Sequence, residues 1–353
     1  MLARHVPSVS HGTWGDSPVR SDEKERPGLG GMEDQAESWF RRRTSHWRDW
    51  PPEQLLRWKA SSGARVSVVI PARDEEATVG GVAGAIAGAF MAGEPLVDEL
   101  VVMDSDSADR TAEVAAAAGA TVYRCRDVAP HLGAYPGKGE ALWKSLLVTT
   151  GDIVVFVDAD LTRWGTHFVT GLLGPLLDPD QRMLLVKACY DRAADGPVGG
   201  GRVTELVARP LLNLWWPELA GVAQPLAGEW AASRSLLETL PIPVGYGVEL
   251  AVLVDTARRH GTGAIAQVDL GERAHRNQPD ADLAVMAAEL LLVAERRRVP
   301  GADAGFAEAG DQQPAGMELR QFVRADGALR PRPRAVPCAE RPPVSALRPS
   351  AAR

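Results

Sequence analysis

The chain has 353 residues, of which 45% are hydrophobic and 24% charged, so we expect a globular protein of one large domain or two. Its net charge of −7 argues against nucleic acid or an anionic membrane as the main partner. The three cysteines, Cys125, Cys189 and Cys338, lack C-x-x-C spacing, which excludes a disulfide framework or zinc site as the organising feature. No apolar run approaches the roughly 18 to 20 residues of a membrane span, and the start lacks a signal peptide's apolar stretch. These features predict a cytoplasmic protein without stable membrane insertion.

The two ends of the chain differ in composition from the middle. Residues 1–36 are rich in Gly, Ser, Pro and charge, and residues 300–353 carry many prolines among arginines, so both are predicted to be disordered tails. Residues 37–64 carry four tryptophans among arginines and are predicted to form an amphipathic arm that packs on the following domain. Stacking of these aromatic side chains on nucleic acid is the alternative interpretation.

From Arg65 to about residue 299, short β-branched runs alternate with helical stretches. Gly119 and Gly261 follow two of the predicted helices, as expected of helix ends. The alternation predicts an α/β fold with a doubly wound, mainly parallel sheet, helices on both faces and loops gathered at one edge. We expect residues 65–190 and 191–299 to form two halves of one domain. Strands are predicted near 65–70, 100–103, 120–123, 153–157, 183–188 and 264–270.

The predicted strand over 153–157 ends at two carboxylates, Asp158 and Asp160. Ligands of open α/β sheets collect at the carboxyl ends of parallel strands, so this pair indicates a ligand crevice and a hard divalent cation. A strand followed by an Asx-type turn is the alternative for this motif alone. Four further polar or glycine-containing segments are expected at the same edge: 71–76, 104–107, 137–140, and 199–204 together with His275.

Taken together, these segments resemble the GT-A type of nucleotide-sugar glycosyltransferase. That class has P-x-x-N/D-E-E after the first strand and D-x-x-S-x-D-x-T after the second, and this chain has PARDEE from Pro71 and DSDSADRT from Asp104. Six further motifs resemble the glucosyl-3-phosphoglycerate synthases of actinobacteria, over roughly residues 65–298: PGKGEALW, VFVDADL, GGGRVTELVARPLL, GEW, GYGVEL and RAHRN.

The resemblance implies a GT-A type fold, a homodimer and a metal-dependent hexosyltransferase. The implied reaction transfers α-glucose with retention from a nucleotide diphosphate glucose, UDP-glucose first, to the 2-hydroxyl of 3-phosphoglycerate. Mg²⁺ is the expected cofactor, with Mn²⁺ and Co²⁺ as alternatives because a histidine ligand suits them. The related mannosyl-3-phosphoglycerate synthases, which use GDP-mannose, are the nearest alternative, and the base of the donor stays open between UDP, ADP and GDP.

Carried over position by position, the resemblance also implies site residues. Metal binding is assigned to Asp160 and His275, and a catalytic role to Asp158, Asp160 and Glu249. The Asp104-x-Asp106 pair is expected to be a decoy without metal. Donor binding is assigned to Pro71, Ala72, Arg73, Glu75, Ser105, Lys138, Asp158, Ala159, Glu229 and Glu249. Acceptor binding is assigned to Gly200, Gly201, Arg202, Thr204, Arg276 and Asn277.

Elementary chemistry supports several of these assignments, and each has an alternative. Glycine N–H groups at a helix start, the Arg202 guanidinium and a hydroxyl suit a phosphate, although a glycine hinge explains the same pattern. Lys138 between two glycines could reach a diphosphate or be a solvated lysine at a helix start, and His275 alone would be a surface loop histidine. Gln278 stands where the family is expected to have arginine, which weakens the acceptor assignment more than the donor assignment.

Three other classes of function would require different features in the sequence. A lipid-directed glycosyltransferase would need membrane helices or an amphipathic anchor, for which the Trp/Arg arm is the single candidate. A nucleotidyltransferase would have a glycine-rich phosphate loop after the first strand, where this chain has PARDEE. A sugar-nucleotide-binding regulator would keep donor affinity without turnover.

Overall fold

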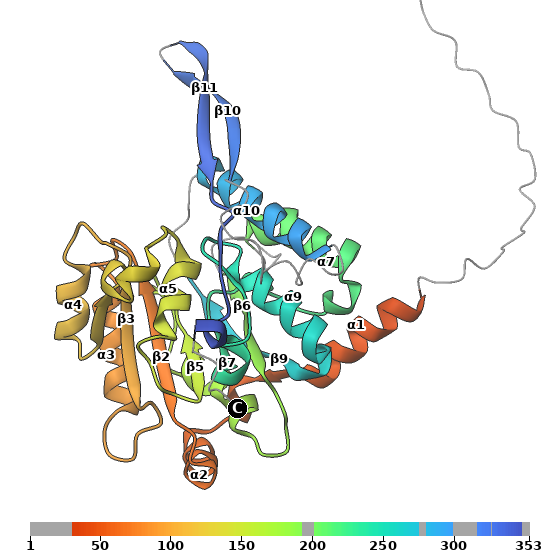
Figure 1. Ribbon diagram of the computed structural model, residues 1–353. Helices are drawn as coiled ribbons and strands as arrows, with labels where there is room; N and C mark the ends of the chain where they lie inside the picture. The colour runs from red at the N-terminus through yellow and green to blue at the C-terminus, as the bar shows by residue number, and fades with distance from the viewer. Residues whose placement is uncertain (1–29, 193–200, 275–279, 299–315, 326, 348–353) are drawn as a thin grey trace, which may run out of the picture.

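The computed structural model describes residues 30–192, 201–274, 280–298, 316–325 and 327–347 (Figure 1). These residues form an eight-stranded central sheet covered by helices on both faces, which confirms the predicted α/β class. All its strands run in one direction except β7, which is antiparallel to both neighbours, β5 and β6. From edge to edge the strands are β1 (Thr44–His46), β9 (Ile265–Arg273), β6 (Leu185–Arg192), β7 (Trp230–Ser233), β5 (Ile153–Phe156), β2 (Val66–Ala72), β3 (Glu99–Asp104) and β4 (Thr121–Arg124).

Two hydrophobic layers enclose the sheet, which explains why its central strands are continuously apolar. In β5, Val154 and Phe156 face one layer while Ile153 and Val155 face the other, because successive strand residues point to opposite faces. The first layer is completed by α5, α7, α8, α9 and α10, and the second by α2, α3, α4 and α6. The helices are α1 (Gly30–Arg43), α2 (Pro52–Ser62), α3 (Val79–Phe90), α4 (Thr111–Ala117), α5 (Lys138–Ser145), α6 (His167–Leu177), α7 (Arg209–Trp215), α8 (Arg234–Leu237), α9 (Val248–His260) and α10 (Asp280–Arg298).

The Trp/Arg-rich segment before the first central strand packs on this body. Its strand β1 pairs with β9 at the edge of the sheet. Trp39 is buried and its indole N–H donates to the Thr262 carbonyl oxygen at 2.8 Å. This anchor holds α1, so the prediction of disorder over residues 1–36 is wrong from residue 30 onward. Residues 1–29 lie outside the described residues.

The predicted disordered tail over 300–353 is also wrong for residues 316–325 and 327–347. Strands β10 (Met317–Ala325) and β11 (Ala328–Val336) form an antiparallel hairpin that projects from the body (Figure 1). The prolines of β11 are compatible with this pairing because the outer side of a two-stranded ribbon needs no N–H donors. The proline- and arginine-rich composition of this segment indicates disorder, although its backbone forms a paired hairpin.

The chain then returns to the body, where β12 (Glu340–Arg341) pairs with β8 (Ile242–Pro243). Both residues of β12 are charged and buried, and their partners lie far away in the sequence. A local pattern cannot reveal such partners, which is why the sequence did not predict this strand. No helix in the described part of the chain is long and apolar enough to cross a membrane.

Candidate active site

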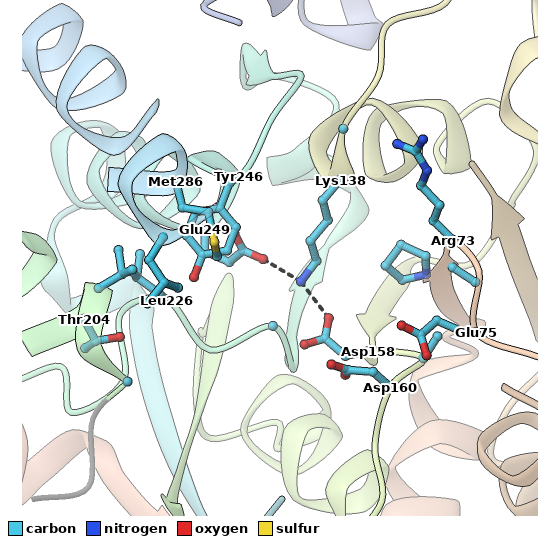
Figure 2. Close-up of a pocket in the computed structure, with 18 of the residues that line it drawn as sticks. Arg73, Glu75, Lys138, Asp158, Asp160, Thr204, Leu226, Tyr246, Glu249 and Met286 are labelled. Carbon is cyan, nitrogen blue, oxygen red and sulfur yellow. Dashed lines mark hydrogen bonds and ion pairs between the residues drawn. The ribbon is translucent and has the colours of Figure 1, made fainter. Parts of the chain in front are cut away.

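A cavity of about 430 Å³ opens at the carboxyl-end edge of the sheet (Figure 2). It is bounded by the ends of β2, β3, β5 and β9, by the starts of α5 and α9, and by residues 201–204. Because all strands but β7 are parallel, their following loops meet at this edge, as predicted. The predicted site residues that line the cavity are Pro71, Ala72, Arg73, Glu75, Ser105, Lys138, Asp158, Ala159, Asp160, Gly201, Arg202, Thr204 and Glu249.

Other predicted site residues are placed elsewhere or fall outside the description. Glu229, assigned to donor binding, is fully buried and is not among the residues that line the cavity. Gly200 and three residues of the loop after β9 lie outside the described residues: His275, Arg276 and Asn277.

Lys138, the first residue of α5, joins two carboxylates across the cavity. Its ammonium group lies 2.7 Å from Asp158 Oδ1 and 2.8 Å from Glu249 Oε1 (Figure 2). Burial alone would lower the pKa of Lys138, but these carboxylates hold its pKa well above the usual value. The lysine therefore carries its charge in the site, and the alternative of a solvated lysine at a helix start is wrong.

The glycines on either side of Lys138 allow the close approach of two backbones. Gly137 has a φ of +129°, and a Cβ there would lie 2.4 Å from the Val244 carbonyl oxygen. A Cβ on Gly139 would lie 1.7 Å from the carbonyl oxygen of Pro243. The G-K-G sequence is therefore required for packing of the α5 start against the segment before α9.

Arg273, the last residue of β9, is a site residue that sequence reasoning missed. It lines the cavity and is 3% exposed. Its guanidinium lies 2.8 Å from Asp158 Oδ2 and 2.9 Å from Glu229 Oε1, and the Tyr190 hydroxyl donates to Glu229 Oε2 at 2.9 Å. Burial opposes the charge, but Glu229 and its neighbours hold the pKa of Arg273 well above the usual value. Glu229 thus orients Arg273 from behind the cavity.

The available signal was the first letter of the RAHRN motif, which lies just after the predicted strand over 264–270 and is the last residue of β9 in the structure. Other cavity residues missed from the sequence are mostly apolar or glycine, and such residues carry no chemical signal of their own. They include Leu226, Tyr246 and Met286, which lie across from Asp158 in Figure 2. Gly228 belongs with them, because a Cβ there would lie 2.1 Å from Asp158 Oδ2.

The two aspartates after β5 have different surroundings. Asp158 is held on one oxygen by Lys138 and on the other by Arg273. Asp160 Oδ1 is buried and accepts no hydrogen bond in the described part of the chain, with Arg273 no nearer than 3.9 Å. Burial, with the Asp158 charge, raises the pKa of Asp160 to about 7. A buried carboxylate oxygen that accepts no hydrogen bond and has its nearest cation at 3.9 Å suits a divalent cation.

The described residues do not form a complete metal cage. They contain no cluster of three or more His, Cys, Asp or Glu side chains arranged to hold an ion. Mg²⁺ sites of this type take one or two carboxylates and fill the remaining positions with water and substrate phosphates. Asp160 fits that role, and Asp158 does not because two cations already occupy it.

Neither aspartate of the Asp104-x-Asp106 pair lines the cavity, although Ser105 between them does. Asp104 is buried and accepts a hydrogen bond from the Ser107 N–H at 3.2 Å. Asp106 forms an ion pair with Arg126 at 2.9 Å on the surface. Asp104 thus bonds within the loop after β3, and Asp106 ties this loop to the turn Cys125–Asp127 after β4. The decoy interpretation stays a prediction.

Comparisons with known proteins can be set beside this geometry. A model of glycosyl transferase family 2 matches residues 67–187. The glucosyl-3-phosphoglycerate synthase of Mycolicibacterium smegmatis is 47% identical over 295 residues, which cover 82% of this chain and 92% of the relative. These matches confirm the resemblance predicted from the motifs.

Solved structures agree with the sequence relatives. A crystal structure of glucosyl-3-phosphoglycerate synthase from Mycobacterium tuberculosis, with Mn²⁺, uridine-diphosphate-glucose and phosphoglyceric acid, has a TM-score of 0.73 and 43% identity, covering 85% of this chain and 96% of that one. Mannosyl-3-phosphoglycerate synthase from Rubrobacter xylanophilus has a TM-score of 0.79 and 38% identity, covering 88% and 99%. With its fold, its cavity and its near-complete alignment to these enzymes, the chain belongs to the glucosyl-3-phosphoglycerate synthase family of glycosyltransferases.

Proposed function

We propose that this protein transfers α-glucose, with retention, from a nucleotide diphosphate glucose to the 2-hydroxyl of 3-phosphoglycerate. UDP-glucose is the donor proposed first, since a relative of 43% identity was crystallised with it. The observation that carries the proposal is the cavity that places Asp160, with its uncompensated oxygen, together with Lys138 and residues 201–204. A metal-dependent site for a diphosphate thus adjoins a helix start suited to a phosphorylated acceptor.

The donor end of the cavity is formed by the turns after β2 and β3. Pro71, Ala72 and Arg73 would frame the base and ribose, and Ser105 would contact the nucleotide. Glu249 would receive a sugar hydroxyl: its Oε1 is paired with Lys138, while its Oε2 is buried and accepts no hydrogen bond within the described residues. A buried carboxylate oxygen without a donor is costly, so a hydroxyl from the substrate would compensate it.

Asp160, with His275 as the second proposed ligand, would hold a divalent cation, which would supply Lewis-acid neutralisation of the charge on the leaving diphosphate. Lys138 contributes a fixed positive charge beside the same position. Arg273 holds the other oxygen of Asp158 and so keeps the Asp158 carboxylate beside Lys138 before substrate binds. The chain's own residues therefore supply positioning and electrostatic stabilisation of the leaving group.

The carboxylates of the cavity do not favour a covalent intermediate. In a double displacement a carboxylate attacks C1. Both oxygens of Asp158 are held, by Lys138 and Arg273, Glu249 shares the Lys138 ammonium group, and Asp160 is the proposed cation ligand. This supports attack by the acceptor hydroxyl on the face from which the diphosphate leaves. The new C1–O bond forms, the C1–O bond to the β-phosphate breaks, and the hydroxyl proton passes to a β-phosphate oxygen.

The acceptor end can be tested with Arg202→Ala. Arg202 is exposed just before the π-helical turn Thr204–Ala208. Gly201 and Thr204 line the cavity beside it. Loss of a charge-assisted bond worth about 1.5–3 kcal/mol should raise the KM for 3-phosphoglycerate about 10- to 100-fold. Initial rates at varied acceptor and donor concentrations would measure it. Arg73→Ala at the donor end is the matched control and should raise the donor KM instead; an unchanged acceptor KM in Arg202→Ala would contradict the phosphate site.

The whole proposal is tested by product formation. Purified protein would be incubated with Mg²⁺ or Mn²⁺, 3-phosphoglycerate and one of four donors: UDP-glucose, ADP-glucose, GDP-glucose or GDP-mannose. We expect glucosyl-3-phosphoglycerate, most rapidly from UDP-glucose, and no product with chelator. Dominant transfer from GDP-mannose would favour the mannosyl alternative, for which the Rubrobacter xylanophilus structure is the supporting observation. Absence of transfer from every donor would contradict the proposal.

The partners and location complete the proposal. The substrates are the nucleotide sugar and 3-phosphoglycerate, with Mg²⁺ as the proposed cofactor and Mn²⁺ or Co²⁺ as substitutes. We propose a homodimer in the cytoplasm, without nucleic acid or stable membrane insertion, consistent with the net charge of −7. Size-exclusion chromatography with light scattering would measure the oligomeric state.

A further inference from the structure

The C-terminal segment, residues 337–347, contacts α5, which carries Lys138, and is linked through Arg297 of α10 to α9, which carries Glu249. It descends from the base of the β10–β11 hairpin onto the body of the molecule (Figure 1). There β12 pairs with β8, and the Val244 N–H donates to the Ala339 carbonyl oxygen at 3.0 Å. The segment does not line the cavity, so any effect on the reaction must pass through the residues it contacts.

Arg341 holds the first turn of α5 through Glu140. Its Nε donates to Glu140 Oε2 at 2.7 Å and its Nη2 to Oε1 at 2.6 Å, a bidentate pair in which both side chains are buried. The same guanidinium donates to the carbonyl oxygens of Leu132 and Gly133. It lies 4.8 Å from the centre of the Trp143 ring. A planar guanidinium meets all these partners at once, which a lysine ammonium group cannot do.

Glu140 is two residues beyond Lys138 and is itself fixed to the backbone before α9. The N–H of Glu140 donates to the Val244 carbonyl oxygen at 2.9 Å, and the N–H of Gly139 to Gly245 at 3.2 Å. β12 pairs with the strand that leads into this same backbone. The C-terminal segment thus holds the start of α5 in two ways. The Arg341 side chain bonds to Glu140, and the backbone of β12 pairs with β8, which leads into the backbone that Gly139 and Glu140 contact.

Glu340, the neighbour of Arg341 in β12, is linked to α9 through Arg297. Its Oε1 accepts from Arg297 Nη1 at 2.8 Å, and Arg297 also donates to Asp255 Oδ2 from Nε and Nη2. Asp255 lies in α9, the helix whose first turn carries Glu249. The two residues of this short strand therefore bond to different helices, Arg341 to α5 and Glu340 to Arg297 of α10, which in turn bonds to α9, because successive strand side chains point to opposite sides.

We propose that Arg341 is a positioning residue that sets Lys138 between Asp158 and Glu249, an inference that rests on the proposed function. Three observations carry it: the buried bidentate pair with Glu140, the backbone contacts of Glu140 and Gly139, and the two short ion pairs of Lys138 at 2.7 and 2.8 Å. Buried ion pairs are weak sources of stability compared with apolar packing, but their geometry is specific. The role assigned to Arg341 is therefore placement of a charge.

The test is a double-mutant cycle between Arg341→Lys and Lys138→Met. Arg341→Lys keeps the charge but loses the bidentate geometry, and displacements of about 1 Å can cost about 100-fold in rate. We expect a fall of about 10- to 100-fold in kcat/KM for the donor when Lys138 is present. In the Lys138→Met background the same change should cost less than about twofold, because coupled sites are not additive. A parallel cycle would measure the Kd for UDP with Mn²⁺ by calorimetry.

Two controls separate positioning from stability. Glu140→Gln keeps the shape of the partner and should reproduce the coupling to Lys138, which also covers the case in which Arg341→Lys does not fold. Lys59→Met removes a largely buried ion pair with Asp98 at 2.9 Å on α2, remote from the cavity. It should lower the urea midpoint while kcat/KM stays within about twofold, as for mutations at independent sites.

Equal costs of Arg341→Lys in both Lys138 backgrounds, in kcat/KM and in the Kd for UDP, would overturn the positioning role. A Glu140→Gln variant that is not coupled to Lys138 would also overturn the positioning role. Coupling to Lys138 in kcat/KM or in the Kd for UDP, reproduced by Glu140→Gln, supports the role. An unmodified chain that binds UDP but transfers no sugar would count against the proposed function, while the UDP cycle would still decide the role of Arg341.

Discussion

Asp160→Ala is expected to abolish metal-dependent transfer while leaving the fold intact. Asp160 is the aspartate after β5 whose Oδ1 accepts no hydrogen bond within the described residues, so the substitution removes the proposed cation ligand and breaks no hydrogen bond of that atom. Lewis-acid stabilisation is worth several kcal/mol, so kcat/KM should fall about 1,000-fold or more. Initial rates over a series of Mg²⁺ and Mn²⁺ concentrations would measure the loss, and calorimetry would measure metal binding with UDP present.

The free energy of unfolding of Asp160→Ala should not fall with its activity. Burial raises the pKa of Asp160 to about 7 from 3.8, so ionisation of this group in the metal-free protein costs stability as the pH rises through that range. Asp160→Ala removes that cost, and its free energy of unfolding at pH 8 with chelator should equal or exceed that of the unmodified chain. The matched control is Asp106→Asn, since asparagine tolerates the φ of +59° there and Asp106 lies outside the cavity. Full activity of Asp160→Ala, or equal losses in both variants, would contradict the metal assignment.

Arg273→Leu is expected to be the most destabilising single change in the site. Arg273 is almost completely buried, and its guanidinium is shared between Asp158 and Glu229. Its removal leaves Glu229 buried with Tyr190 as its remaining side-chain hydrogen-bond donor in the described part of the chain. Breaking one side of a buried ion pair costs about 3–5 kcal/mol. Urea denaturation would measure this loss, and transfer activity should fall as well because Asp158 loses one of its two supports.

A second substitution separates the two effects. In Arg273→Leu combined with Glu229→Gln, the uncompensated buried charge is gone, so most of the lost stability should return. Activity should not return, because Asp158 Oδ2 still lacks the Arg273 guanidinium and only Lys138 holds this carboxylate. Arg273→Lys is the conservative control and should keep part of both quantities. An Arg273→Leu protein with unchanged stability would show that Glu229 does not depend on this arginine.

The residues of the donor half were largely predictable from sequence, because local patterns encode them. The β-branched and apolar run over 153–157, which is followed by Asp158 and Asp160, indicates both a buried strand and the end of that strand. Parallel topology then brings every such end to one edge of the sheet. Prolines, acidic turns and glycine-flanked lysine could thus be assigned to one cavity before any distance was known.

Roles that depend on distant neighbours could not be predicted in the same way. Asp158 and Asp160 are two positions apart and chemically identical, and only the positions of Lys138 and Arg273 decide which aspartate is left for a cation. Glu229 was expected in contact with the donor, yet it lies behind Arg273 in the core. Burial of a charged side chain is a property of its packing and has no local signature.

The sequence by itself determined the class of fold, the edge of the sheet that carries the site, and the family to which the chain belongs, because periodicity and motif spacing are local properties. Only the tertiary structure decided how the charges are shared. The long-range pairs Arg273–Glu229 and Arg341–Glu140 join residues 44 and 201 positions apart. The energy of such a pair depends on distance and burial in the folded chain, and composition alone had suggested disorder where Arg341 is buried.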